Sequence, residues 1–238
     1  MTPSASILPP AIPNERIAVL EWGAETDRFR PDAPGQPPYA RPAAPITAVF
    51  AGAFRTWHGA IHLVDAVKTL RARGRSEIGA VLIGDGPELA RVRQAAAGVE
   101  AIVITGALPH DRMPAALAAA DIGVAPFDLA AHAPLSLGFY WSPLKIFEYM
   151  ASALPVVAPA ANRLPSLVAD GREGILYDPS RPDALADALL ALTDSTLRRR
   201  LGLAARARAE REYSWRAHCE ALERAILNAG PRRRAPTA

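Results

Sequence analysis

Residues 142–159 have the sequence SPLKIFEYMASALPVVAP, which predicts a short helix followed directly by a buried strand. Ser142 is a favourable residue just before a helix, and Pro143 suits the first helical position, where a missing N–H costs nothing. The run LPVVA is apolar, β-branched and of strand length, and Pro155 prevents the helix from continuing into it. The stretch therefore predicts one helix–strand step of an α/β fold.

Two charged residues of this stretch suit a bound ligand better than a purely structural helix. Lys145 lies in the first helical turn, where the helix dipole disfavours a cation by about 0.3–1 kcal/mol. Glu148 lies on nearly the same helix face as the apolar Leu144 and Ala151. A bound anion would remove the first difficulty, and ligand hydroxyls would remove the second. The alternative is a weak surface ion pair between Lys145 and Glu148, which are one helical turn apart.

Helices and strands alternate along the chain before and after this stretch. Other apolar segments have the length of a strand, and they lie at residues 46–54, 80–83, 101–106, 122–126 and 173–177. The segments between the first four carry apolar residues at helical spacing. Strands that are apolar throughout and alternate with helices form a parallel sheet covered on both faces. We therefore predict a doubly wound, Rossmann-like α/β domain.

The 238 residues, half of them hydrophobic, suffice for one substantial domain. Composition and pattern divide the chain into four parts. Residues 1–44 are a proline-rich lead and linker with one short strand at 17–20, and residues 45–212 are the Rossmann-like domain with helices after its last strand. Residues 213–229 form a final helix, and residues 230–238 are a basic tail.

Composition excludes several classes of protein. Cys219 is the single cysteine, so neither an internal disulfide nor a cysteine-rich metal site is expected. The formal net charge of +3 is modest and does not indicate a nucleic-acid partner. No apolar run is long enough to span a bilayer, and the first residues lack the pattern of a signal peptide. We expect a cytoplasmic protein, with weak attraction of the basic tail to an anionic membrane surface as the sharper alternative to a solvated end.

Ligands of open parallel sheets bind beyond the carboxyl ends of the strands, so the residues that follow each strand are the candidates. Gly52 and Gly59 enclose a turn that opens a helix, where backbone N–H groups and His58 could hold phosphate; a plain tight turn explains the glycines equally well. Gly84 belongs to a GDGP turn, for which an ordinary connection is favoured over a ligand floor. The backbone of residues 106–110 could bind the edge of a planar base.

The stretch at 142–159 carries the strongest chemistry. Ser142 and the free amides of the first helical turn can bind a diphosphate, Lys145 adds a positive charge, and Glu148 can accept two hydrogen bonds from a ribose diol. This arrangement needs no metal or other cofactor, and no DxD-like pair of carboxylates follows a strand. Neither a Walker A loop nor a catalytic triad is recognisable.

Five segments occur in a characteristic order and spacing: VFAGAFRTWHG, VLIGDGP, TGALPHDRMPAALAAADIGVAPF, SPLKIFEYMASALPVVA and DGREGILYDP. Together they resemble the C-terminal, nucleotide-sugar-binding half of family 4 glycosyltransferases of the GT-B type, over residues 17–227. The resemblance implies a retaining, metal-independent transferase with Lys145 and His58 as the catalytic residues. It implies that the donor contacts Gly52, Arg55, Gly84, Gly106, Leu108, Tyr140, Ser142, Pro143, Leu144 and Glu148.

The chain departs from the family pattern at the donor site. In that family, two glutamates separated by seven residues flank the donor; Glu148 matches the second, and Tyr140 stands in place of the first. The usual glycine-arginine and lysine-glycine pairs become Gly52-Ala53 and His58-Gly59. The cations left near a diphosphate are then His58, Lys145 and Arg55, and the identity of the sugar stays open.

The family also implies a second Rossmann-like half, which holds the acceptor. We expect that half to be missing or to be a separate chain, which would meet an apolar rim at Trp57, Phe139, Tyr140 and Trp141 unless these aromatics only pack their loop. One alternative is a catalytically silent nucleotide-sugar-binding subunit of another transferase. A sugar-nucleotide epimerase of the same architecture is disfavoured, because LPSLVADGREGILYDP follows the transferase pattern more closely.

Overall fold

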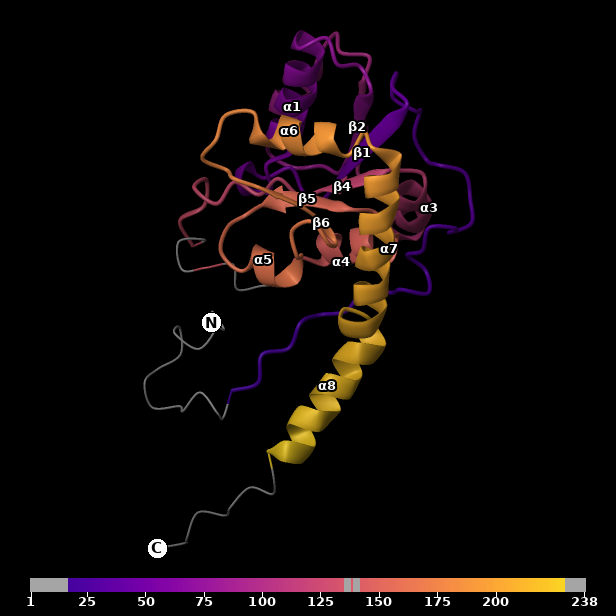
Figure 1. Cartoon of the computed structure of the whole chain (residues 1–238), viewed down its shortest axis with the longest axis vertical. Helices are drawn as coiled ribbons and strands as arrows, with labels where there is room; N and C mark the ends of the chain where they lie inside the picture. The colour runs from indigo at the N-terminus through magenta and orange to yellow at the C-terminus, as the bar shows by residue number, and fades with distance from the viewer. Residues whose placement is uncertain (1–16, 135–137, 139–141, 230–238) are drawn as a thin grey trace, which may run out of the picture.

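The computed structural model describes residues 17–134, 138 and 142–229, and its centre is a parallel sheet (Figure 1). The six strands are arranged in the order β3-β2-β1-β4-β5-β6. Their bounds are Ile46–Ala51 for β1, Ile78–Ile83 for β2, Ile102–Gly106 for β3, Ile122–Val124 for β4, Val156–Pro159 for β5 and Gly174–Tyr177 for β6. The predicted doubly wound α/β fold is confirmed.

The order of the strands locates the natural ligand crevice. The chain runs outward from β1 to β2 and β3, and then returns to place β4 on the other side of β1. At this reversal the connections from β1 and β4 leave toward opposite faces of the sheet, which opens a crevice beyond the carboxyl ends of these two strands. The fold therefore places a candidate site between β1 and β4 before any side chain is considered.

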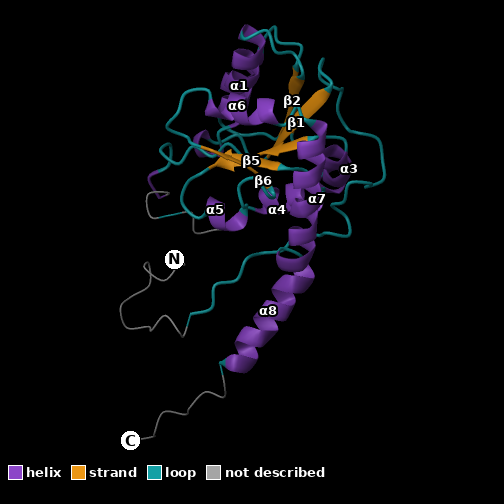
Figure 2. Cartoon of the chain, in the orientation of Figure 1, coloured by secondary structure: helices purple, strands orange, loops and turns teal. Residues whose placement is uncertain are grey.

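Helices cover both faces of the sheet, and every residue of β1, β2 and β4 is therefore buried. Along β1, Ala48 and Phe50 belong to the core on one face, and Val49 and Ala51 belong to the core on the other. The first core is closed by α1 (Ala60–Ala72), α2 (Leu89–Ala96) and α6 (Ala184–Ala191). The second is closed by α3 (Met113–Ala118), α4 (Leu144–Ala151), α5 (Leu164–Leu167) and α7 (Ser195–Glu212), as Figure 2 shows.

The last helix, α8 (Trp215–Asn228), leaves the domain and extends away from the sheet (Figure 1). Its first turn is capped by Ser214, whose hydroxyl oxygen accepts a hydrogen bond from the Ala217 amide at 3.1 Å. None of its residues is buried. The linker docks where α7 meets α8, because Ala24 pairs with Ser214 in an isolated β-bridge. The linker and the final helix therefore meet at one end of the domain.

Some expected elements differ from the structure. Residues 17–20 form no strand, because no strand of the sheet lies beside this part of the linker. The strands expected at 46–54 and 122–126 end earlier, at Ala51 and Val124. Within the described residues, no helix combines the length and the apolar character that crossing a bilayer requires.

Candidate functional site

A cavity of about 500 Å³ lies beyond the carboxyl ends of β1 and β4; we call it the switch-point cavity. Nine of the twelve predicted site residues line it: Gly52, His58, Gly84, Leu108, Ser142, Pro143, Leu144, Lys145 and Glu148. The other lining residues are Ala51, Ala53, Ile83, Asp85, Ala107, Met113 and Phe127. Segments from four strand ends and the starts of α3 and α4 therefore meet at the reversal of the strand order, where such a fold binds ligands.

Three predicted site residues do not line this cavity. Arg55 is exposed before the short 3-10 helix Thr56–His58, and Gly106 ends β3 one residue before the cavity wall. Tyr140 lies outside the described residues, as do Phe139 and Trp141 of the predicted apolar rim. Of that rim the structure describes Trp57, which is half-buried and has its ring centroid 6.4 Å from that of Phe127.

Gly52 and Gly84 let the ends of β1 and β2 approach closely enough to form the cavity wall. Both have positive φ angles, 149° and 144°, which side chains rarely adopt. A Cβ atom on Gly84 would lie 1.9 Å from the carbonyl oxygen of Gly52. A Cβ atom on Gly52 would lie 2.6 Å from Nζ of Lys145. Glycine at these two positions therefore leaves room for both the backbone and the lysine.

Lys145 places a cation in the wall of the cavity without a partner. Its Nζ atom is buried and donates to no protein oxygen within hydrogen-bond distance in the described chain, although the residue as a whole is only partly buried. It lies 4.4 Å from the ring centroid of Phe50 and 5.2 Å from that of Phe127, which partly compensate the charge. Burial lowers the pKa of Lys145 to about 7, and Glu148 opposes this shift.

Glu148 points a carboxylate toward the same cavity from the next turn of α4. Burial raises the pKa of Glu148 to about 7; Lys145 opposes this shift and Glu25 adds to it. No ion pair within 4.0 Å joins Glu148 to Lys145, so the alternative of a surface ion pair is wrong. The cavity thus holds a cation and a carboxylate that do not satisfy each other and are open to separate ligand groups.

His58 also lines the cavity, and its surroundings keep the imidazole neutral. Its Nδ1 lies 2.5 Å from the carbonyl oxygen of Ala53, so Nδ1 carries the proton and donates. Burial lowers the pKa of His58 to about 4; Lys145 and Arg55 lower it further, and the hydrogen bond to Ala53 opposes them. Only Nε2 is left for a ligand, and without an anion the ring adds no charge at neutral pH.

Ser142 does not cap α4, contrary to the prediction. The helix begins at Leu144, and no side chain accepts from its first amides. The Ser142 hydroxyl instead accepts from the Trp22 amide at 2.9 Å and donates to Oε2 of Glu21 at 2.9 Å. Glu21 also forms an ion pair with Arg163. The linker therefore ties down the start of α4, a contact that no local pattern signals because Glu21 and Ser142 are 121 positions apart.

The described residues contain no cluster of side chains that could bind a metal ion. In the ranges that the structure describes, no three His, Cys, Asp or Glu side chains come together as metal ligands do. The polar groups that line the site are backbone groups, one ammonium, the carboxylates of Glu148 and Asp85, one imidazole and the Ser142 hydroxyl, and Asp85 already accepts from the Gly86 amide. Such a set suits an anion bound next to a hydroxyl-bearing group.

Comparisons with known sequences agree with this geometry. The family model for glycosyl transferases group 1 matches residues 45–195. MMP alpha-(1->4)-mannosyltransferase of Mycolicibacterium hassiacum is 33% identical over 210 residues, which cover 86% of this chain and 46% of that protein. Sulfoquinovosyl transferase SQD2 of Arabidopsis thaliana is 34% identical over 139 residues, which cover 57% of this chain and 25% of that protein.

Solved structures share the fold. Sucrose-phosphate synthase from Thermosynechococcus elongatus superposes with a TM-score of 0.67 at 22% identity, over 90% of this chain and 53% of that one. Anabaena Alr3699/HepE in complex with UDP and glucose gives a TM-score of 0.62 at 21% identity, over 78% of this chain and 48% of that one. The C-terminal domain of the group 1 protein LpcC from Francisella tularensis gives 0.57 at 24% identity, over 81% and 99%.

The extent of these matches decides what they establish. The chain spans about half the length, or less, of the curated relatives it matches, for example 46% of the mannosyltransferase and 25% of SQD2. The part it does share includes every strand of the sheet and the whole switch-point cavity. Because the family model matches more than half of the 238 residues, the chain belongs to the group 1 glycosyl transferases.

Proposed function

We propose that this chain is the donor-binding half of a glycosyltransferase and that the switch-point cavity holds a nucleotide diphosphate sugar. The observation that carries this proposal is Nζ of Lys145, which is buried in the cavity wall without a hydrogen-bond partner. A buried unpaired donor is costly, and diphosphate oxygens would supply the missing acceptors. The family and the Anabaena structure, which is a complex with UDP and glucose, are consistent with such a donor.

The proposed chemistry follows from the charges of the cavity. Lys145 and the positive end of the α4 dipole stabilise the negative charge that builds up on the departing diphosphate, in place of a metal ion. Glu148 accepts hydrogen bonds from the ribose hydroxyls. A bound diphosphate favours protonation of His58, which then donates through Nε2. Transfer with retention at the sugar carbon is proposed from the family resemblance.

Nucleotide binding is the direct test. Purified chain is titrated with UDP, GDP and ADP by calorimetry, and its melting temperature is followed in parallel. We expect at least one nucleotide to bind, and Lys145→Ala and Glu148→Ala to lose that binding. Lys68→Ala is the matched control, because Lys68 is exposed on α1 and outside the cavity. A protein that responds to none of the three nucleotides overturns the proposal.

A catalytically silent binding subunit is the second candidate. It is favoured by Tyr140, which stands where the family has the first of its two glutamates. Such a subunit would bind the nucleotide sugar through Lys145 and Glu148 without consuming it. Release of nucleoside diphosphate from UDP-glucose or GDP-mannose by the purified chain would exclude this candidate. Binding without release, with or without an added acceptor, would favour it.

We further propose that a separate acceptor half packs against α8. The exposed apolar side chains of this helix support the proposal; they are Trp215, Leu222, Ile226 and Leu227. Leu222→Ser combined with Ile226→Ser should prevent that association without changing nucleotide affinity.

Weak contact of the basic tail, residues 230–238, with an anionic membrane and a cytoplasmic location remain part of the proposal. Sedimentation with anionic and neutral vesicles tests the membrane contact.

A further inference from the structure

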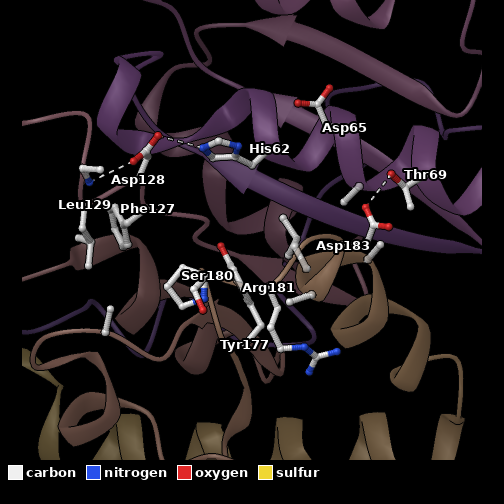
Figure 3. Close-up of a pocket in the computed structure, with 17 residues that line it drawn as sticks. His62, Asp65, Thr69, Phe127, Asp128, Leu129, Tyr177, Ser180, Arg181 and Asp183 are labelled. Atoms are coloured by element: carbon white, nitrogen blue, oxygen red, sulfur yellow. Dashed lines mark hydrogen bonds and ion pairs between the residues drawn. The ribbon is translucent and has the colours of Figure 1, made fainter.

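A second cavity, of about 580 Å³, lies between α1 and the connection from β6 to α6 (Figure 3). Phe127 lines both this second cavity and the switch-point cavity. One wall is a single face of α1, because His62, Asp65 and Thr69 are three and seven positions apart along the helix. The facing wall includes Tyr177 at the end of β6 (Figure 3).

Several polar groups of the second cavity hold one another in place. Oδ1 of Asp128 accepts from the amides of Ala130 and Ala131 at 3.1 Å each, and Oδ2 lies 3.3 Å from Nε2 of His62. Thr69 donates a long hydrogen bond of 3.5 Å to Asp183. These bonds fix the wall before any ligand arrives, which lowers the entropic cost of binding.

Two polar groups of the second cavity are unengaged. Asp65 belongs to α1 and lines the cavity. Its carboxylate makes no hydrogen bond and no ion pair in the described chain. The hydroxyl of half-buried Tyr177 likewise has no hydrogen-bond partner in the ranges described. Burial and the nearby carboxylate of Asp128 raise the pKa of Tyr177, so this hydroxyl keeps its proton and can donate. The cavity therefore offers one free acceptor and one free donor.

The charges of the second cavity exclude an anionic ligand such as a nucleotide. Its walls carry three carboxylates, on Asp65, Asp128 and Asp183. The guanidinium of Arg181 lies in the same wall, 3.6 Å from the carboxylate of Asp187, which also pairs with Arg73 at 2.7 Å, and the three carboxylates outnumber this single guanidinium. Metal ligands do not gather there either within the described chain. A ligand of this cavity must therefore be uncharged or cationic.

The remaining walls favour an uncharged ring that carries hydroxyls. Phe127, Leu129, Leu185 and several alanines give an apolar surface, against which the C–H face of a sugar can pack. Sugar hydroxyls both donate and accept, so they match a carboxylate and a phenol that are both unengaged. The volume lies within the usual range of small-molecule sites, roughly 300–1,000 Å³.

We propose that the second cavity binds a neutral saccharide, with Asp65 accepting from its hydroxyls and Tyr177 donating to it. Such a site would hold a sugar unit of the acceptor or of the product beside the switch-point cavity, with which it shares Phe127. The proposal does not require nucleotide binding, so it can fail or succeed independently of the proposed function.

Ligand-observed and amide-observed NMR of the full chain test this site. The probes are methyl α-D-glucopyranoside, methyl α-D-mannopyranoside and maltose at millimolar concentration. We expect binding of at least one probe, weakened about three- to tenfold in Asp65→Asn and in Tyr177→Phe, as loss of one hydrogen bond predicts. Asp27→Asn is the matched control, because Asp27 is also an exposed carboxylate without a partner but lies outside the cavity.

The outcomes separate this site from the switch-point cavity. Glu148→Ala should keep the saccharide affinity of the unchanged protein, and saturating UDP or GDP should not displace the probe. Failure of all three probes to bind, or equal affinity in Asp65→Asn, Tyr177→Phe and the unchanged chain, overturns the proposal. Displacement of the probe by nucleotide also overturns it, because the probe would then occupy the switch-point cavity. Saccharide binding without any nucleotide binding would refute only the proposed function.

Discussion

The switch-point cavity and the second cavity share the side chain of Phe127, but their charged groups are in opposite states. In the switch-point cavity, Nζ of Lys145 is buried, has no partner, and has its pKa lowered to about 7. In the second cavity, the carboxylate of Asp128 is bound by two amides and by His62. The unpaired charge of the switch-point cavity is therefore buried, whereas in the second cavity Asp128 and Asp183 are paired and the unpaired Asp65 is exposed to water.

This difference separates stability from binding. An unpaired buried charge destabilises the ligand-free protein, and a ligand that pairs with it gains a correspondingly large interaction. A polar group that is already paired stabilises the fold and has less to offer a ligand. Mutations of the charged groups in the two cavities should therefore change the free energy of unfolding with opposite signs.

The largest effect is expected from Lys145→Met. Replacing the buried ammonium by an uncharged side chain of similar length should raise the free energy of unfolding of the ligand-free protein by about 4 kcal/mol at pH 7, from the shift of the pKa of 10.5 to about 7. The same variant should bind UDP or GDP about 10- to 100-fold more weakly. Urea unfolding and calorimetry measure the two effects, with Lys68→Met as control. If Lys145→Met lowered the free energy of unfolding, the Lys145 ammonium would have to be paired in the folded protein, contrary to this prediction.

The pH dependence of stability should show the same charge with a definite sign. The unfolded chain binds the Lys145 proton more tightly than the folded chain, so the free energy of unfolding should rise as pH rises above 7. The expected gain from pH 7 to pH 9 is about 2 kcal/mol. Glu148, whose pKa is raised to about 7, costs stability as pH rises toward 7, and its opposing slope fades within about one pH unit above 7. Urea unfolding should show this slope, and Lys145→Met should abolish it.

The sequence predicted the sheet and most of the switch-point cavity because both have local signatures. Strands buried on both faces are continuous apolar runs, and the residues after them carry the glycines. Helix α7 begins at Ser195 because Asp194 caps it through the amides of Thr196 and Leu197, a local signal that the sequence shows directly. The run IAVL at 17–20 is equally apolar but forms no strand, because no strand of the sheet lies beside it.

What the sequence did not predict depends on contacts between distant segments. Ser142 was expected to cap α4, but Glu21 takes its hydroxyl from 121 positions away. No local sequence pattern predicts the second cavity, because most of its residues come from three separate segments: α1, the connection after β4, and the β6–α6 connection. On α1 alone, His62, Asp65 and Thr69 have the pattern of an ordinary solvated helix face. Only the packing of α6 beside α1 turns that face into a wall.

Within the second cavity, Asp128→Ala should destabilise the protein, opposite in sign to Lys145→Met. The variant loses the hydrogen bonds to the amides of Ala130 and Ala131 and the contact with His62. These groups are partly exposed and can bind water instead, so the expected loss is about 1–2 kcal/mol. Asp128→Asn keeps an acceptor for the two amides and should lose less. Urea unfolding at pH 7 ranks the three proteins, and equal stability would contradict a self-satisfied wall.

The smallest effect is expected from Tyr177→Phe, and its smallness is informative. Because the Tyr177 hydroxyl has no hydrogen-bond partner in the described chain, removing it should change the free energy of unfolding by less than about 0.5 kcal/mol. Saccharide binding should still weaken, which a structural hydroxyl would not explain. Urea unfolding and NMR titration of one preparation give both values. A loss of stability above about 1 kcal/mol would mean that the hydroxyl is paired within the protein, and the second cavity would then have no donor to offer.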